Sequence, residues 1–140
     1  MMKVTRRGMC LGLPALAAAG LATAEEAPLG TKISRFEDLP VNTAGKNRYR
    51  PIAEGVLHDG HPVEAHATEL APGNMPHGSH RHKHEEMFLI REGTIEVTVN
   101  GKATRLGPGG VAFIGSGEDH GIRNIGDTPA HYFVVALGRD

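Results

Sequence analysis

Histidine and glutamate side chains crowd one short stretch of the chain. Four of the nine histidines lie within eight residues, and two glutamates follow at once: His77, His80, His82, His84, Glu85 and Glu86. Alternate side chains of a β-strand lie on one face, about 6.6 Å apart along the chain. His80 and His82 are therefore able to converge on one ion, and Glu86 can join them if the strand continues in register. The alternation of side chains along a strand does not decide which histidines bind the ion, because His84 lies on the same face as His80 and His82.

The residue types in this cluster favour a transition metal. Neutral imidazoles with one carboxylate suit Mn, Fe, Ni, Cu or Zn better than Mg or Ca. Cys10 is the only cysteine, and it lies in an N-terminal segment that we expect to be removed. The mature chain would then offer no thiolate ligand, no thiol nucleophile and no disulfide. The alternative interpretation is a solvated, histidine-rich loop that chelates metal weakly and without a purpose.

Two segments, in order along the chain, resemble the two sequence motifs of the cupin superfamily. The first, GSHRHKHEEMFLIREG, has the spacing His-x-His, three residues, Glu, six residues, Gly, with matches at His80, His82, Glu86 and Gly93. The second, GGVAFIGSGEDHGIRN, has matches at Gly109, Gly117, His120 and Asn124. Gly115 stands where the family usually has proline. The resemblance covers residues 50 to 137, approximately, and indicates a small single-domain cupin.

The resemblance implies one divalent ion held by three histidines and one glutamate, namely His80, His82, Glu86 and His120. Two adjacent coordination positions stay open for water, oxygen or substrate. One carboxylate leaves the site with a net charge of about +1, which attracts diketones, enediols or carboxylates and can polarise them. Glu86 is also expected to be catalytic, as a general base that takes a substrate proton. The alternative ligand in place of His80 is His84.

Other side chains are candidates for the same pocket. His66 either faces the barrel interior, where it would touch substrate, or lies on the outer surface. Asn124 is expected to fix a turn instead of contacting substrate. Four apolar residues are expected to line the pocket as plain packing: Phe88, Ile90, Phe113 and Ile122.

The elements that must position these residues are short strands separated by glycine and proline turns. Pro62–Leu70 alternates with period two, which indicates a half-buried strand. Asn100-Gly101 is a strong hairpin signal between Thr94–Val99 and Lys102–Leu106. Further strands are expected at Met87–Arg91, Val111–Ile114 and His131–Leu137, with less clear ones at Ile33–Val41 and Asn47–Leu57.

No stretch after residue 25 has helical spacing, so the sequence predicts an all-β fold of antiparallel strands, a barrel or a sandwich. The resemblance makes this the cupin double-stranded β-helix, or jelly-roll, barrel. We place the barrel domain at residues 46–140 and an N-terminal tether with a first strand at residues 25–45.

Residues 1–24 have the pattern of an export signal. A basic start is followed by an apolar stretch, and Ala22-Thr23-Ala24 provides a small-x-small cleavage site before Glu25. The pair Arg6-Arg7 resembles the twin-arginine signal that exports folded proteins. The alternative is a general secretory signal. Either route predicts a periplasmic or secreted protein, and the stretch is too short for a membrane anchor.

The charge pattern excludes some classes of partner. The chain has 15 Lys+Arg and 16 Asp+Glu, scattered without a basic stripe, so neither nucleic acid nor an anionic membrane is an expected partner. Met87–Arg91 is apolar on both faces, and a small barrel covers only one of them. An exposed apolar sheet face usually marks a partner surface, so we expect a homodimer.

The expected function is that of a metal-dependent enzyme on a small oxygen-rich substrate, either a dioxygenase similar to quercetin dioxygenases or an isomerase or lyase of sugar acids. The fold alone does not decide this. A complete ligand set favours an enzyme over a non-catalytic small-molecule binder, because binding-only cupins often lose ligands. The third alternative is a metal-handling protein, which would gather further ligands such as His77 and His84 at the ion.

Overall fold

The computed structural model describes residues 27–140, and the regular elements in this range are strands and one 3₁₀ turn, η1 (Phe36–Asp38). The predicted signal peptide, residues 1–24, lies outside the described residues. Among residues 27–140, no helix is long and apolar enough to cross a membrane. The strands are β1 (Asn42–Ala44), β2 (Asn47–Val56), β3 (Pro62–Leu70), β4 (Glu85–Glu92), β5 (Ile95–Val99), β6 (Lys102–Leu106), β7 (Val111–Ile114), β8 (His120–Asn124) and β9 (Ala130–Leu137).

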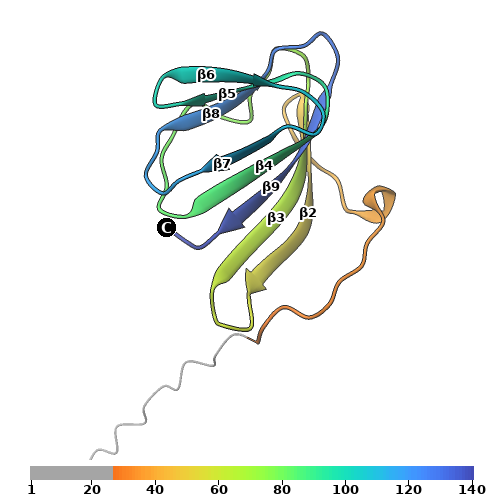
Figure 1. Ribbon diagram of the computed structural model, residues 1–140. Coiled ribbons are helices and arrows are strands. Elements are labelled where there is room, and N and C mark those ends of the chain that lie inside the picture. The colour runs from red at the N-terminus through yellow and green to blue at the C-terminus, as the bar shows by residue number, and fades with distance from the viewer. Residues whose placement is uncertain (1–26) are drawn as a thin grey trace, which may run out of the picture.

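The strands form two antiparallel sheets that face each other (Figure 1). The larger has the order β1-β2-β3-β9-β4-β7, and the smaller has the order β6-β5-β8. An isolated bridge between His80 and His120 adds the histidine-rich loop to the end of β8, through two backbone hydrogen bonds of 3.0 Å. The prediction of an all-β jelly-roll barrel is confirmed.

The hydrophobic core lies between the two sheets. Five buried side chains point inward from β4, β7 and β9 of the larger sheet: Phe88, Ile90, Ile114, Tyr132 and Val134. They face Ile95 and Val97 of β5 and Ile122 of β8 in the smaller sheet. Burying one such side chain is worth about 1.5–3 kcal/mol. The alternation of buried and less buried residues along β4 and β9 leaves their other faces on the outside of the barrel.

The hairpin predicted at Asn100-Gly101 joins β5 to β6. Asn100 and Gly101 have φ of +47° and +79°, as a two-residue type I′ turn requires. The pairing Val99↔Lys102 closes the ladder beside this turn. A local signal therefore sets the register of the smaller sheet, which carries His120 on its β8 edge.

Strand β3 turns its polar face toward the interior. His66 and Thr68 stand opposite Val134 and Tyr132, two residues of the core. Val63, Ala65 and Ala67 consequently occupy the outer face. This polar inner face is the wall on which part of the functional cavity is built.

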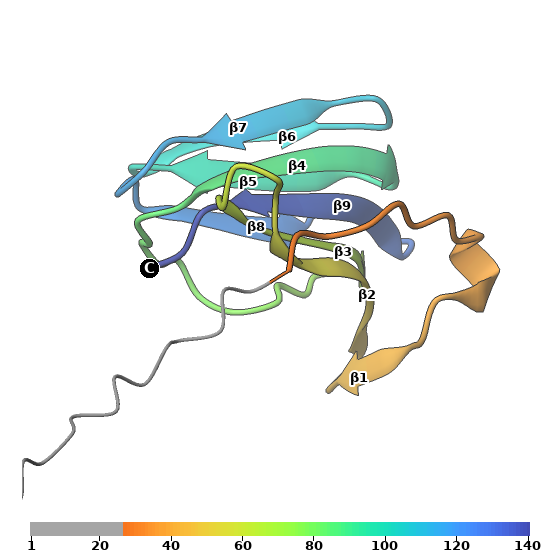
Figure 2. The same cartoon turned by 90° about the horizontal axis from the view of Figure 1, so that it is seen from below.

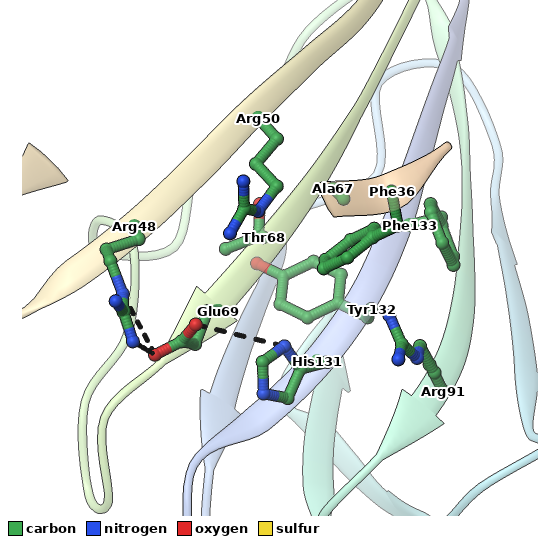
Figure 3. A pocket seen from close by; sticks show the side chains of 10 residues that line it. All are labelled: Phe36, Arg48, Arg50, Ala67, Thr68, Glu69, Arg91, His131, Tyr132 and Phe133. Carbon is green, nitrogen blue, oxygen red and sulfur yellow. Dashed lines mark hydrogen bonds and ion pairs between the residues drawn. The ribbon is translucent and has the colours of Figure 1, made fainter. Parts of the chain in front are cut away.

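The segment before β1 covers part of the outer face of the larger sheet (Figure 2). Leu29 donates its backbone N–H to the Val56 carbonyl at 2.8 Å. Phe36 packs edge-on against Phe133, with a centroid distance of 6.4 Å, in an outer crevice shown in Figure 3. The guanidinium groups of Arg50 and Arg91 lie 4.8 and 4.5 Å from the Phe36 ring centroid, within the range of cation–π attraction.

Candidate metal centre

Three histidines and one glutamate converge at one end of the barrel. His80 and His82 come from the loop before β4, Glu86 from β4, and His120 from the first position of β8. Ligand nitrogens of the three histidines all lie within 4.8 Å of one another. His120 is 1% exposed and His82 8%, so the cluster is shielded from bulk water. The structure thus brings together the four residues that the motif spacing selects.

Backbone carbonyls fix the tautomers of two of these histidines. Nδ1 of His82 lies 2.7 Å from the His84 carbonyl oxygen, and Nδ1 of His120 lies 2.9 Å from the Glu118 carbonyl oxygen. A carbonyl only accepts, so each Nδ1 carries the proton and each Nε2 of a neutral ring presents a lone pair. Hydrogen bonds of this kind orient metal-binding imidazoles in proteins.

The lone pairs point at the same carboxylate oxygen. Oε2 of Glu86 lies 3.3 Å from Nε2 of His82 and 3.2 Å from Nε2 of His120. The contact of Glu86 with His120 has hydrogen-bond geometry, and lone pairs at this distance repel unless a proton or a metal ion lies between them. These nitrogen–oxygen distances match the distances between neighbouring ligand atoms around an ion whose bonds are about 2.0–2.2 Å long. The arrangement therefore fits a bound cation.

Two buried nitrogens in the cluster lack a hydrogen-bond partner, Nδ1 of His80 and Nε2 of His82. An unsatisfied buried polar atom costs about 1–3 kcal/mol, and an ion is one of the partners that removes this cost. Burial, reinforced by the neighbouring imidazoles of His77, His120 and His82, lowers the pKa of His80. A neutral imidazole is the form that binds metal, so the donor set suits a divalent transition metal.

His84 does not join this set in the observed conformation. Its ring is stacked on the His82 ring, 3.7 Å away and inclined by only 4°. Ligand atoms of His82, His84 and Glu86 also lie within 4.8 Å of one another, with Nε2 of His84 3.7 Å from Oε1 of Glu86. An ion lies close to the plane of an imidazole that binds it, so the parallel stacking of these two rings disfavours a shared ion. The rings of His80, His82 and His120 are inclined to one another by 47° to 75°, and their planes can meet at one point. Geometry thus favours the set with His80 over the alternative with His84.

A cavity of about 70 Å³ adjoins the cluster, enough for several waters or a small ligand. His80, Glu86 and His120 form one wall, and its other walls come from β3, β4, β8, β9 and the loop before β4: His66, Thr68, Pro76, His77, Phe88, Gly121, Ile122, Tyr132 and Val134. Phe88 and Ile122 line it as predicted, whereas Ile90 belongs to the hydrophobic core and is not part of the lining. The prediction for Phe113 is wrong: the register Glu86↔Ile114 turns Ile114 inward, and Phe113 lies on the outer face, 57% exposed.

The cavity also answers the question that the sequence left open for His66. This residue faces the interior, and its Nδ1 lies 2.9 and 3.0 Å from the two carboxylate oxygens of Glu64. The spacing of two along a strand places both side chains on one face. That signal was present in the sequence, but nothing in it chose which face of β3 is inside.

Asn124 holds a turn, as expected. Its side chain is fully buried, donates to the carbonyls of Leu70 at 3.0 Å and Thr128 at 2.8 Å, and accepts from the Gly126 N–H at 2.9 Å. All of its hydrogen-bonding groups are thus engaged with the backbone, away from the cavity lining.

Comparisons with known proteins agree on the fold. A family model described as the cupin domain matches residues 66–136. No curated protein matches the sequence. A predicted oxalate decarboxylase from Thermotoga maritima is 23% identical with a TM-score of 0.63, over 76% of this chain and 98% of that one.

Two further solved structures are similar. The polyketide cyclase RemF from Streptomyces resistomycificus is 19% identical with a TM-score of 0.63, over 77% of this chain and 80% of that one. A sugar phosphate isomerase from Silicibacter pomeroyi is 16% identical with a TM-score of 0.62, over 78% of this chain and 76% of that one. At these identities the likeness shows the fold alone.

Proposed function

We propose that this chain, which belongs to the cupin domain family, is a metal-dependent enzyme that acts on a small oxygen-rich substrate by dioxygenase, isomerase or lyase chemistry. One observation carries the proposal: three imidazoles and one carboxylate converge on an internal cavity large enough for more than one water. A solvated histidine-rich loop would not bury His82 and His120 or fix their tautomers.

Each residue of the cluster has a definite task in this proposal. His80, His82, Glu86 and His120 would hold the ion, which when bound polarises oxygen atoms of a ligand as a Lewis acid. Glu86 is the only carboxylate among the four, so it sets their combined charge. Phe88, Ile122 and Val134 give the cavity apolar walls, which strengthen electrostatic interactions inside it.

The alternative of a metal-handling protein would bring additional ligands to the ion. The candidates are His77, whose ring centroid lies 4.2 Å from that of His80, and His84, which forms a second group with His82 and Glu86 but is stacked face to face on His82. A non-catalytic binding module differs from an enzyme only in its turnover, so the test must measure turnover.

The test is metal analysis of protein purified from its native compartment, followed by oxygen-uptake and product assays with diketones, catechols and sugar acids. We expect one transition metal ion per chain and turnover of at least one of these classes. His82→Ala is the control, since it removes a buried ligand and should lose both metal and turnover. Stoichiometric metal with no turnover in any assay would favour a non-catalytic binding module over an enzyme. Protein without metal would contradict both the enzyme and the metal-containing binding module.

The export proposal rests on residues 1–24 and concerns the compartment in which the protein works. The twin-arginine pair suits a protein that takes up its metal while folding in the cytoplasm and then crosses the membrane folded. Mass spectrometry of exported protein should give an N-terminus at Glu25. Arg6→Lys combined with Arg7→Lys should stop export, whereas unchanged export of this variant would indicate the general secretory route.

A further inference from the structure

His66 of β3 lines the same cavity as the metal cluster, and its ring contacts the carboxylate of Glu64 on the same strand. Nδ1 of His66 lies 2.9 and 3.0 Å from the two oxygens of Glu64, so Nδ1–H donates a hydrogen bond to the carboxylate. Nε2 of the neutral ring then carries a lone pair, and no hydrogen bond to Nε2 is found within residues 27–140. Tyr49 packs edge-on against the ring at 6.3 Å, which restricts its rotation.

This pair is built like a general base with its orienting group. The carboxylate fixes the tautomer and stabilises the imidazolium that forms when the ring takes a second proton. The side chains of His66 and Glu64 are 27% and 35% exposed, so the ring is accessible from the cavity that it lines.

Other groups near the cavity are less suited to this task. Burial raises the pKa of Tyr132, with a smaller opposing effect of Thr68, so the phenol keeps its proton. His77 is exposed, and its Nδ1 lies 3.0 Å from the Gly78 carbonyl oxygen instead of a carboxylate. The titratable groups that face the pair or the cavity are Tyr49, Glu54, His77, His80, Glu86, His120 and Tyr132.

The cavity lining also limits the charge of the ligand. Among the described residues that line it there is no arginine or lysine. A dicarboxylate or a phosphate ester would bring anionic oxygens beyond those that the ion can neutralise, and sites for such groups usually supply arginine or lysine. A base is needed instead when the ligand arrives as a neutral, weakly acidic hydroxyl.

We infer that the cavity takes a neutral enediol, catechol or hydroxyketone, and that His66 accepts the hydroxyl proton while Glu64 stabilises the resulting imidazolium. This inference rests on the proposed function. In the step the substrate O–H bond breaks, its electron pair stays on oxygen, and a new N–H bond forms at Nε2 of His66. Glu64 keeps its hydrogen bond to Nδ1 throughout, and no oxidant or reductant is consumed.

The test uses metal-loaded protein and the chromogenic diol 4-nitrocatechol, whose absorbance distinguishes its neutral and singly deprotonated forms. We expect wild-type protein to bind the singly deprotonated form in mildly acidic buffer, in which the free diol is neutral. His66→Gln should retain metal and melting temperature but lose affinity about tenfold or more, the usual value of a charge-assisted hydrogen bond. The loss of affinity for nitrocatechol should be smaller in alkaline buffer, where solvent takes the hydroxyl proton. Glu64→Gln should also lose affinity, but less than His66→Gln.

Two controls separate this role from a structural one. His131→Gln changes a histidine that also lies between carboxylates, 4.0 Å from Glu69 and 3.9 Å from Glu92, but lines the outer crevice (Figure 3). It should leave binding unchanged. Acetate is already ionised and carries a single charge, so its own inhibition constant against nitrocatechol binding should be the same in wild type and His66→Gln.

The outcomes separate a failure of the proposed metal-dependent function from a failure of the proton-acceptor role of His66. Wild-type protein that holds no metal overturns the proposed function and this inference with it. Protein that holds metal but does not bind nitrocatechol, or a His66→Gln variant with the wild-type affinity and pH profile, overturns this inference alone. Loss of metal from His66→Gln would show that the residue supports the cluster and is not the proton acceptor.

Discussion

Glu86 determines the charge of the candidate metal centre. Its Oε2 lies near both His82 and His120, and its side chain is 15% exposed. The three imidazoles are neutral donors, so removing this one negative charge raises the charge of the loaded site by a full unit. A group in this position affects both ligand binding and the acidity of whatever binds.

We therefore expect Glu86→Gln to separate metal retention from reactivity. Glutamine keeps the shape and one oxygen donor, so most of the metal should stay. Turnover should fall about 10²-fold or more, because the carboxylate can no longer act as a general base, a role separate from the deprotonation of the bound hydroxyl by His66. Metal content and the catalytic rate of the same preparations provide the measurement. His82→Ala should instead lose the metal. Full turnover by metal-loaded Glu86→Gln would mean that the carboxylate only holds the ion.

The sequence predicted the grouping of the four residues, because the motif spacing determined it. Strand parity alone did not choose between His80 and His84, which share a strand face, whereas the motif spacing selected His80. The stacking of His84 on His82 depends on the path of the loop. The sequence also did not place His66, because β3 reverses the usual rule and turns its polar side chains inward. The polar side chains of β3 face inward because they border a polar cavity. An alternation of apolar and polar residues in the sequence does not reveal such a cavity.

Glycines at the ends of strands determine how the barrel elements meet. Gly93, between β4 and β5, has φ of +84°, and a Cβ built there would lie 2.6 Å from Cβ and 2.7 Å from Cα of Ala130. Gly109, before β7, has φ of +82°, but nothing lies within 4 Å of its Cβ position. The two glycines thus share a backbone conformation and differ in their surroundings.

Gly93→Ala and Gly109→Ala form a matched pair. The left-handed conformation costs a non-glycine residue about 1–2 kcal/mol, which both variants should lose in free energy of unfolding. Gly93→Ala must also push back the first residues of β9, so its total loss should reach about 3 kcal/mol or more. Urea denaturation measures both values. Equal losses would contradict the close approach of Gly93 to Ala130.

Asn124 ties the end of β8 to the end of β3 through Leu70 and to the following turn through Thr128. Asn124→Ala would leave these two carbonyls without their buried donor, each at a cost of about 1–3 kcal/mol. We expect a loss of about 3 kcal/mol in free energy of unfolding, with little change in metal affinity per folded molecule. Asn74→Ala, which removes only a 3.4 Å contact with Asn47, should change stability by less than about 0.5 kcal/mol.

The strands that the sequence predicted well have strong local signals. The Asn100-Gly101 turn and the apolar runs of β4 and β9 fall where expected. Strand β8 was not predicted as a strand, because HGIRN contains only one large apolar residue. Its first residue, His120, lies in the metal cluster, and its last, Asn124, binds backbone groups. Its position follows from pairing with β5 across the smaller sheet, a long-range contact that no local pattern reveals.

At the scale of the whole molecule, the outer face of the larger sheet is only partly covered. The segment before β1 packs Phe36 over Phe133 (Figure 3). Leu89, Val111 and Phe113 stay 36%, 55% and 57% exposed, and Leu89 pairs directly with Val111. They belong to β4 and the edge strand β7, so an apolar surface and an unpaired strand edge coincide.

The proposed homodimer would bury this surface against a second copy of the chain. Aromatic residues at the centre of an interface contribute about 2 kcal/mol or more each, so Phe113→Glu should weaken association by about thirtyfold or more. Sedimentation velocity over a concentration series should then show a dimer for wild type and a monomer for the variant. Ile125→Glu, at an exposed apolar position in the loop after β8, should leave the dimer intact. A monomeric wild type at every concentration would contradict the proposal, and a dimer unchanged by Phe113→Glu would place the interface on another face.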